Sequence, residues 1–378
     1  MPSWSLRPSG KSAEPPVVLD TGRVQYELVR PLGQGHHGEL LLTRQCYPGG
    51  KGGYEVIKRL NRITREQDLQ RLVEEARLST QLRHPNLVAV HALVGSEAEP
   101  CLLMEYVEGS SLDELMRLAA QAGRPLSEAF ACYVGAELAD ALQYVNTAPG
   151  VHGQSLAVVH RDVTPHSILV GRHGEVKLMD FGAAYSQLPG RVSSEGDNSD
   201  LGSIAYGAPE RALMERFDGR ADLYSLGLVL FQILSGRHLL GAEARFEAEL
   251  RSRQLRARGE SPSSRRTEGL EELSPRRTAA YLRRLITLSP QFIDEETLPL
   301  SEGLRPILRK ALAPRPEDRM ASGSELAGAL KGYLERTWPH YGRLELAAEV
   351  ESLREAALHG LEETPPRKGR LFRRKRRK

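Results

Sequence analysis

Long apolar runs, clustered cysteines and an apolar leader segment are all absent from this chain of 378 residues. Its three cysteines are scattered, so we expect neither a disulfide framework nor a zinc site, and a reducing, cytoplasmic location follows as the expectation. No apolar run reaches the roughly 18 residues that cross a bilayer. The longest, residues 223–234, indicates a buried helix. The N-terminus is rich in Pro and Ser and has no apolar signal segment. These absences argue against a secreted or membrane-spanning protein.

Positive charge is concentrated at the C-terminal end of the chain. The net charge is +3, but residues 367–378 hold nine Arg or Lys and no acid, which leaves the rest of the chain at −6. Polybasic segments are attracted to anionic lipid headgroups and to nucleic-acid phosphates. Residues 367–378 are therefore a candidate contact for an anionic membrane surface or nucleic acid, and a solvated tail is the alternative.

The hydrophobic pattern changes from strand-like to helical along the chain. Alternating apolar residues predict strands in the first part, with a glycine-rich turn at residues 48–53. The predicted strands cover residues 26–32, 40–43, 54–60, 87–93 and 102–107. One helix interrupts them, with a capping-box pair of Thr64 and Gln67 and an apolar stripe that includes Leu72 and Ala76. From residue 111 onward the pattern is helical, and the clearest helices cover residues 128–146, 222–234 and a segment capped by Ser322 and Glu325.

Two tripeptides carry the strongest chemical signal: His160-Arg161-Asp162 and Asp180-Phe181-Gly182, eighteen residues apart. Short apolar segments follow the first and precede the second, so we expect two short strands that present both carboxylates to one cleft. Phosphoryl transfer needs such a pair, because one carboxylate orients the attacking hydroxyl and the other holds the magnesium ion.

With these motifs the chain resembles eukaryotic-type (Hanks-type) protein kinases, notably the Ser/Thr kinases of bacteria such as myxobacteria. The loop Gly33-Gln34-Gly35-His36-His37-Gly38 has the G-x-G-x-x-G form, which dinucleotide-binding folds also use. Here the loop leads into a strand rather than a helix, which favours the kinase interpretation. Ala208-Pro209-Glu210 and Arg319 match the family's buried ion pair, and the motifs extend from about residue 26 to residue 335.

The resemblance implies an α+β, two-lobed protein kinase fold: a small antiparallel β-rich N-lobe with one main helix, and a larger, mainly helical C-lobe. Residues 237–300 are Arg-rich and match a variable region. Residues 343–361 suggest a further helix, which we expect to pack on the large lobe, with a partner or dimer contact as the alternative. The expected divisions are a disordered segment 1–22, an N-lobe 23–104, a hinge 105–109, a C-lobe 110–337, a helical extension 338–363 and a basic tail 364–378.

The same resemblance implies ATP and Mg²⁺ as cofactors. Lys58 is expected to grip the α- and β-phosphates and to pair with Glu75, although Glu74 is a competing choice. Asp162 is the candidate base for the substrate hydroxyl, and Asp180 is the candidate magnesium ligand. The further nucleotide contacts that the resemblance implies are Leu32, Gly33, Gly35, Gly38, Leu40, Met104, Glu105 and Val107.

Three residues depart from the family pattern. Thr164 stands where most Ser/Thr kinases have a catalytic lysine whose charge meets the γ-phosphate, and it is a candidate catalytic residue that can donate a hydrogen bond there but brings no charge. Ser167 stands where an asparagine braces the loop and binds a second magnesium ion, and its hydroxyl is a candidate magnesium ligand. Ser79 puts a hydroxyl where the family's internal spine is apolar. We therefore expect a bacterial signalling kinase that transfers the γ-phosphoryl of Mg-ATP to Ser/Thr hydroxyls of protein substrates, itself included. The alternative is a pseudokinase that acts as an ATP-responsive scaffold.

Overall fold

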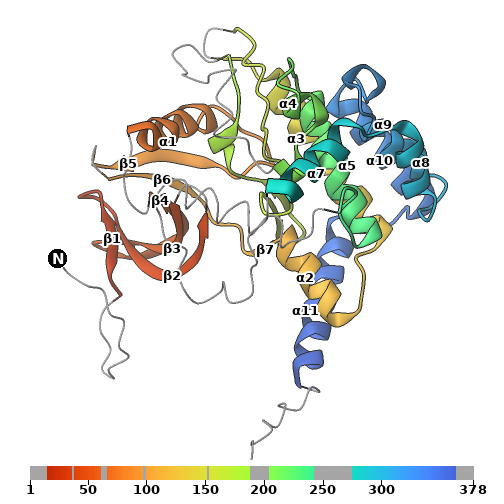
Figure 1. Cartoon of the computed structure of the whole chain (residues 1–378). Coiled ribbons are helices and arrows are strands. Elements are labelled where there is room, and N and C mark those ends of the chain that lie inside the picture. Colours follow the sequence, from red (N-terminus) through yellow and green to blue (C-terminus); the bar gives the residue numbers. More distant parts are fainter. Residues whose placement is uncertain are drawn as a thin grey trace, which may run out of the picture.

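The computed structural model describes residues 15–35, 38–60, 66–96, 99–150, 153–187, 204–241 and 275–362. These residues form a β-rich lobe and a larger helical lobe that meet at the middle of the molecule (Figure 1). The predicted two-lobed α+β fold is confirmed.

The N-lobe is an antiparallel sheet of six strands with one helix, α1 (Glu66–Ser79), on it (Figure 1). The strand order is β1-β2-β3-β4-β6-β5, and each neighbouring pair is antiparallel. The strands are β1 (Val17–Asp20), β2 (Gln25–Gly35), β3 (Gly38–Tyr47), β4 (Gly50–Arg59), β5 (Val90–Gly95) and β6 (Pro100–Glu105).

Two local expectations in this lobe are wrong. Residues 17–20 were expected to be disordered as part of segment 1–22, but they form β1 and pair with β2. The glycine-rich turn is also shorter than expected, because β4 begins at Gly50, which pairs with Tyr47. Main-chain hydrogen bonds hold these glycines in the sheet without help from side chains. Turn composition alone therefore overestimated the length of the turn.

The C-lobe is built around two buried helices, α3 (Glu128–Thr147) and α5 (Arg220–Ser235), as the apolar pattern predicted. They approach closely at Gly135, where an added Cβ would lie 2.8 Å from Leu230 Cδ2. A small antiparallel sheet of β7 (Gly109–Ser111), β8 (Ile168–Gly171) and β9 (Val176–Leu178) lies at the junction with the N-lobe. Among the described residues the other α-helices are α2 (Leu112–Ala122), α4 (Pro209–Ala212), α7 (Pro275–Ile286), α8 (Pro290–Thr297), α9 (Arg305–Ala311), α10 (Gly323–Thr337) and α11 (Arg343–Glu362).

Capping chemistry defines the start of α10 as the sequence predicted. The Ser322 hydroxyl accepts a hydrogen bond from the Glu325 main-chain N–H at 3.2 Å, and the Glu325 carboxylate accepts one from Ala321 N–H at 2.7 Å. The other predicted capping box, at Thr64, lies outside the described residues.

The C-terminal helix α11 runs along α2 (Figure 1), which confirms the prediction that it packs on the large lobe. Leu346, Val350 and Leu353 of α11 are buried there. Polar contacts add to the apolar ones: Arg354 donates to the Ser110 hydroxyl at 3.1 Å, and the Glu349 carboxylate accepts from the Ser127 hydroxyl at 2.7 Å. The helix is therefore continuous with the C-lobe core.

In the part of the chain that the structure describes, no helix is both long enough and apolar enough to cross a membrane. The basic tail 364–378, and the segment between residues 242 and 274, lie outside that part. The proposed contacts of the tail with a membrane surface or nucleic acid remain predictions.

Candidate active site

Three charged side chains from separate elements meet where the lobes join. Lys58 lies on β4, Glu75 on α1, and Asp180 follows β9. The Lys58 ammonium is 2.8 Å from each Glu75 carboxylate oxygen and 3.0 Å from Asp180 Oδ1. The structure thus favours Glu75 over Glu74 as the partner of Lys58. Burial alone would lower the pKa of Lys58, but Asp180 and Glu75 outweigh it, so its pKa is raised and the amine stays charged.

The glycine loop closes the hairpin between β2 and β3 over this site. Gly33 pairs with Leu40 and Gly35 with Gly38, so the hairpin reaches the last residues before its tip. Gly38 has φ +149°, and a Cβ there would lie 2.0 Å from the Arg59 carbonyl oxygen. Only glycine fits at this position, because the loop lies directly against the strand that carries Lys58. Residues 36–37 lie outside the described part.

An apolar cluster joins the two lobes beside the Lys58 site. Leu32, Leu40 and Met104 of the N-lobe pack in one group with Leu169 and Met179 of the C-lobe. Apolar side chains from both lobes, next to a buried charged lysine, would suit the flat faces of a nucleotide base. Sequence reasoning missed Leu169 and Met179, although both lie in the short apolar segments that flank the two tripeptides.

The side chain of Glu105, the last residue of β6, is held by neighbouring segments. The Glu105 carboxylate accepts hydrogen bonds from the Lys177 ammonium and from Ala89 N–H, each at 3.0 Å. Because its side chain is engaged with neighbouring strands, a contact of Glu105 with a nucleotide would use the main chain. Val107 is half-buried in the same apolar group.

Asp222, near the start of α5, holds the loop that contains His160, Arg161 and Asp162. Its two carboxylate oxygens accept from His160 N–H at 2.7 Å and from Arg161 N–H at 2.9 Å. The His160 ring accepts from Asp162 N–H at its Nδ1 (3.3 Å), and its Nε2 lies 3.2 Å from the Met179 carbonyl oxygen. Burial lowers the pKa of His160, so the ring is neutral and carries its proton on Nε2. These bonds fix the main chain that leads into Asp162.

Ser167 retains half of the role that the family gives to asparagine. Its hydroxyl donates to the Asp162 carbonyl oxygen at 2.7 Å and accepts from Thr164 N–H at 3.0 Å. It therefore braces the loop from inside. Thr164 is buried, and its hydroxyl accepts from Ser167 N–H at 3.3 Å, so it takes part in the same brace. Two contacts remain predictions: that of Thr164 with the γ-phosphate and that of Ser167 with magnesium.

Ser79 ends α1 with its hydroxyl buried, and among the described residues that hydroxyl has no hydrogen-bond partner. Replacing it with alanine should raise the free energy of unfolding by about 1 kcal/mol, since an unsatisfied buried hydroxyl is removed and helix propensity improves. Chemical denaturation measures the change. Ser322→Ala is the matched control: the same atom is lost from a helix cap that is used, so stability should fall by about 1 kcal/mol. Equal losses in both variants would contradict the prediction.

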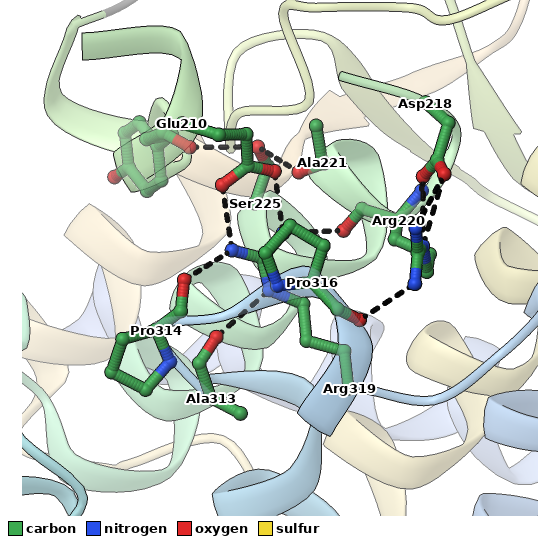
Figure 2. Close-up of polar contacts among 10 residues, drawn as sticks. Glu210, Asp218, Arg220, Ala221, Ser225, Ala313, Pro314, Pro316 and Arg319 are labelled. Carbon is green, nitrogen blue, oxygen red and sulfur yellow. Dashed lines mark hydrogen bonds and ion pairs between the residues drawn. The ribbon is translucent and has the colours of Figure 1, made fainter. Parts of the chain in front are cut away.

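The ion pair Glu210–Arg319 ties α4 to the loop before α10 (Figure 2). Arg319 Nη1 and Nη2 donate to the two Glu210 oxygens at 2.6 and 2.7 Å. The remaining guanidinium donors bond the carbonyl oxygens of Ala313, Pro314 and Arg220 at 2.8, 2.9 and 3.1 Å. The Arg319 side chain has no exposed area. The predicted pairing across more than a hundred residues is thus present in the structure.

A β-rich lobe and a helical lobe, with a lysine–glutamate pair and two carboxylates at their junction, define the class of protein kinases. The family model described as "Protein kinase domain" matches residues 26–329. The chain therefore belongs to the protein kinase family, and the resemblance inferred from its motifs is confirmed.

Bacterial kinases are among the most similar curated proteins. The chain is 30% identical over 328 residues to the Tyrosine-protein kinase MasK of Myxococcus xanthus, which covers 85% of this chain and 45% of that protein. It is also 30% identical over 311 residues to the Serine/threonine-protein kinase Pkn1 of Myxococcus xanthus, covering 81% and 38%. PknJ, a serine/threonine-protein kinase of Mycobacterium tuberculosis, is 35% identical over 224 residues, covering 58% and 35%. The chain thus spans less than half the length of these relatives.

A solved structure agrees on the fold. A double mutant of the Mycobacterium tuberculosis PknI kinase domain superposes with a TM-score of 0.50 at 22% identity, covering 83% of this chain and 99% of that one. This likeness supports the shared architecture.

Proposed function

We propose that this chain is an active protein kinase that transfers the γ-phosphoryl of Mg-ATP to serine or threonine hydroxyls of proteins, including its own, in bacterial signalling. The observation that carries the proposal is the Lys58 ammonium, which contacts Glu75 and Asp180 together. In protein kinases the lysine–glutamate pair must form, and the second carboxylate must face the metal site, before transfer can occur. The alternative, a pseudokinase, rests on Thr164, Ser167 and Ser79, but the Ser167 hydroxyl still bonds the Asp162 carbonyl oxygen.

Each residue has a defined part in the proposed reaction. Lys58 would hold the α- and β-phosphates, while the glycine loop covers them with main-chain N–H groups. Asp162, fixed by the bonds of its loop, would orient the substrate hydroxyl and take its proton as the oxygen attacks the γ-phosphorus. The bond to the leaving β-phosphate oxygen breaks as the new bond forms. The apolar cluster around Met104 and Leu169 would hold the base.

The oxygen donors at the site suit magnesium, which proteins bind through one or two carboxylates together with substrate phosphates. Asp180 supplies a carboxylate that is 32% exposed. No group of three or more His, Cys, Asp or Glu side chains in the described part of the chain could enclose a metal by itself. Magnesium, when bound, neutralises charge on the phosphates.

The choice of serine and threonine as acceptors rests on the relatives Pkn1 and PknJ, which are named serine/threonine kinases. MasK is named a tyrosine kinase. Acid hydrolysis of the autophosphorylated protein releases its phosphoamino acids. Electrophoresis then separates phosphoserine, phosphothreonine and phosphotyrosine and so decides between these acceptors.

The direct test is autophosphorylation with γ-labelled ATP and Mg²⁺ in wild type and Asp162→Asn. Loss of the general base is expected to lower incorporation by about 10²–10⁴-fold, since Asn cannot take the hydroxyl proton. Asp294→Asn is the control, because Asp294 is exposed and pairs with Arg309 on the far side of the C-lobe. Wild type that binds ATP without incorporating phosphate would favour the pseudokinase. Unchanged incorporation in Asp162→Asn would remove Asp162 from the mechanism.

A further inference from the structure

Arg211 is a buried arginine beside the catalytic loop that the sequence analysis did not single out. It follows Glu210 on α4 and is 8% exposed. Glu210 turns toward Arg319, whereas Arg211 reaches the segment that carries the catalytic tripeptide. A single arginine after Glu210 gives no sign in the sequence of such a position.

The guanidinium of Arg211 holds one main-chain group of that tripeptide. Its Nη1 donates to the Arg161 carbonyl oxygen at 2.5 Å. The N–H of the same residue is bound by Asp222 at 2.9 Å. Arg161 has φ +68°, a left-handed conformation that a non-glycine residue holds only when its surroundings impose it. Arg211 and Asp222 therefore hold the strained residue at its two ends.

The side chain of Arg161 is fixed separately. Its guanidinium carbon lies 4.5 Å from the ring centre of Phe217 and 5.1 Å from that of Tyr185. Because these contacts orient the side chain of Arg161 and leave its carbonyl oxygen untouched, the bond from Arg211 is an independent constraint on the peptide that leads into Asp162.

Arg211 also brings a positive charge to a loop with several acids. The carboxylates that act on it are Asp222, Asp162 and Glu210. Burial lowers the pKa of Arg211, yet a guanidinium remains charged under all ordinary conditions. Thr164 brings no charge where most of the family has a lysine. Arg211 thus supplies a cation close to the catalytic carboxylate.

We propose that Arg211 is a positioning residue for the transfer reaction: its bond to the Arg161 carbonyl oxygen sets the Arg161–Asp162 peptide and so aims the Asp162 carboxylate at the substrate hydroxyl. This inference rests on the proposed kinase function. In this role Arg211 would act through the main chain and would contact neither nucleotide nor substrate.

Arg211→Met keeps a long side chain but removes the donors and the charge. Misplacing a catalytic group by about 1 Å can cost about 10²-fold, so we expect kcat to fall by about 10–100-fold. KM for ATP should change by less than about 2-fold, because the nucleotide contacts remain. Arg211→Lys keeps the charge and should recover part of kcat. Arg216→Met is the matched control, since Arg216 is an exposed arginine five residues further on.

The pH profile gives a readout that a merely structural role would not move. Burial raises the pKa of Asp222 to about 6, opposed by the N–H donors of His160 and Arg161 and by the charges of Arg211 and Arg161. Protonated Asp222 cannot accept both bonds, so activity should fall as the pH drops through about 6. Without the charge of Arg211 that pKa rises further. The fall of kcat on the acid side of the pH profile should therefore occur at higher pH in Arg211→Met than in wild type. In Arg211→Lys, which keeps the charge, the shift should be much smaller.

Hydrogen exchange tests the constraint without depending on catalysis. The amides of His160 and Arg161 should exchange faster in Arg211→Met, while those of α3 and α5 keep their wild-type rates. If wild type transfers no phosphate, the proposed function fails, and unchanged exchange in the variant would then overturn the role of Arg211 as well. If the methionine variant does not fold, the lysine variant decides. The inference is overturned if a folded Arg211 variant has the same kcat, the same acid side of the pH profile and the same exchange rates at His160 and Arg161 as wild type.

Discussion

Arg319→Met is expected to lower the free energy of unfolding by about 3–5 kcal/mol, because it leaves the Glu210 carboxylate buried without its cation. Glu210 is 3% exposed, and three carbonyl oxygens lose their donor in addition. The midpoint of urea unfolding followed by circular dichroism measures the loss. Such a change is far above the effect of an ordinary surface substitution.

The matched control is Arg309→Met, which breaks an ion pair on the surface. Arg309 is 53% exposed and its partner Asp294 is 41% exposed. Exposed pairs contribute about 0–1 kcal/mol, so the two methionine variants should differ several-fold. The double variant Glu210→Gln with Arg319→Met should lose less than Arg319→Met alone, since the unpaired charge is gone. A loss below about 1 kcal/mol in the single variant would contradict the buried-pair account.

Lys58→Met is expected to reduce phosphate incorporation by at least about 10²–10³-fold, the usual cost of removing one preorganised electrostatic contact from a transition state. The variant also leaves the carboxylates of Glu75 and Asp180 facing each other without the ammonium that lies between them. Their repulsion should loosen α1, which hydrogen exchange of residues 69–79 would detect. Both effects have the same cause, since one ammonium serves both carboxylates.

Lys51→Met is the control for this experiment. Lys51 lies on the same strand, is 52% exposed and pairs with Glu27 at 2.8 Å. It should retain incorporation and the exchange rates of α1. Incorporation by Lys58→Met at the wild-type rate would mean that the phosphates are held by other groups, and the proposed site would then be wrong.

The sequence motifs predicted much of the candidate site, because kinase chemistry depends on particular residue types at fixed spacings. Lys58, Glu75, Asp180 and the pair Glu210–Arg319 lie where the sequence placed them. Apolar periodicity likewise predicted α3, α5 and α11. Such patterns are local and can be read without knowing which elements pack together.

Other features depend on contacts between segments distant in the sequence. Strand β5 begins at Val90 rather than at residue 87, because Leu87 forms a bridge with Leu178 of the C-lobe. Ser167 looked like a loss of function, yet its hydroxyl bonds the Asp162 carbonyl oxygen and keeps the loop braced. Residue identity alone could not show where that hydroxyl points.

The sequence by itself determined the family, the two-lobed architecture and the identity of the charged residues, since each is written in local patterns and fixed spacings. Only the tertiary structure decided what surrounds those residues. It placed Leu169 and Met179 against the N-lobe, sent Arg211 to the Arg161 carbonyl oxygen and buried the hydroxyl of Ser79. The physical reason is that hydrogen-bond direction and burial are set by packing between distant segments, and a linear pattern carries no record of that packing.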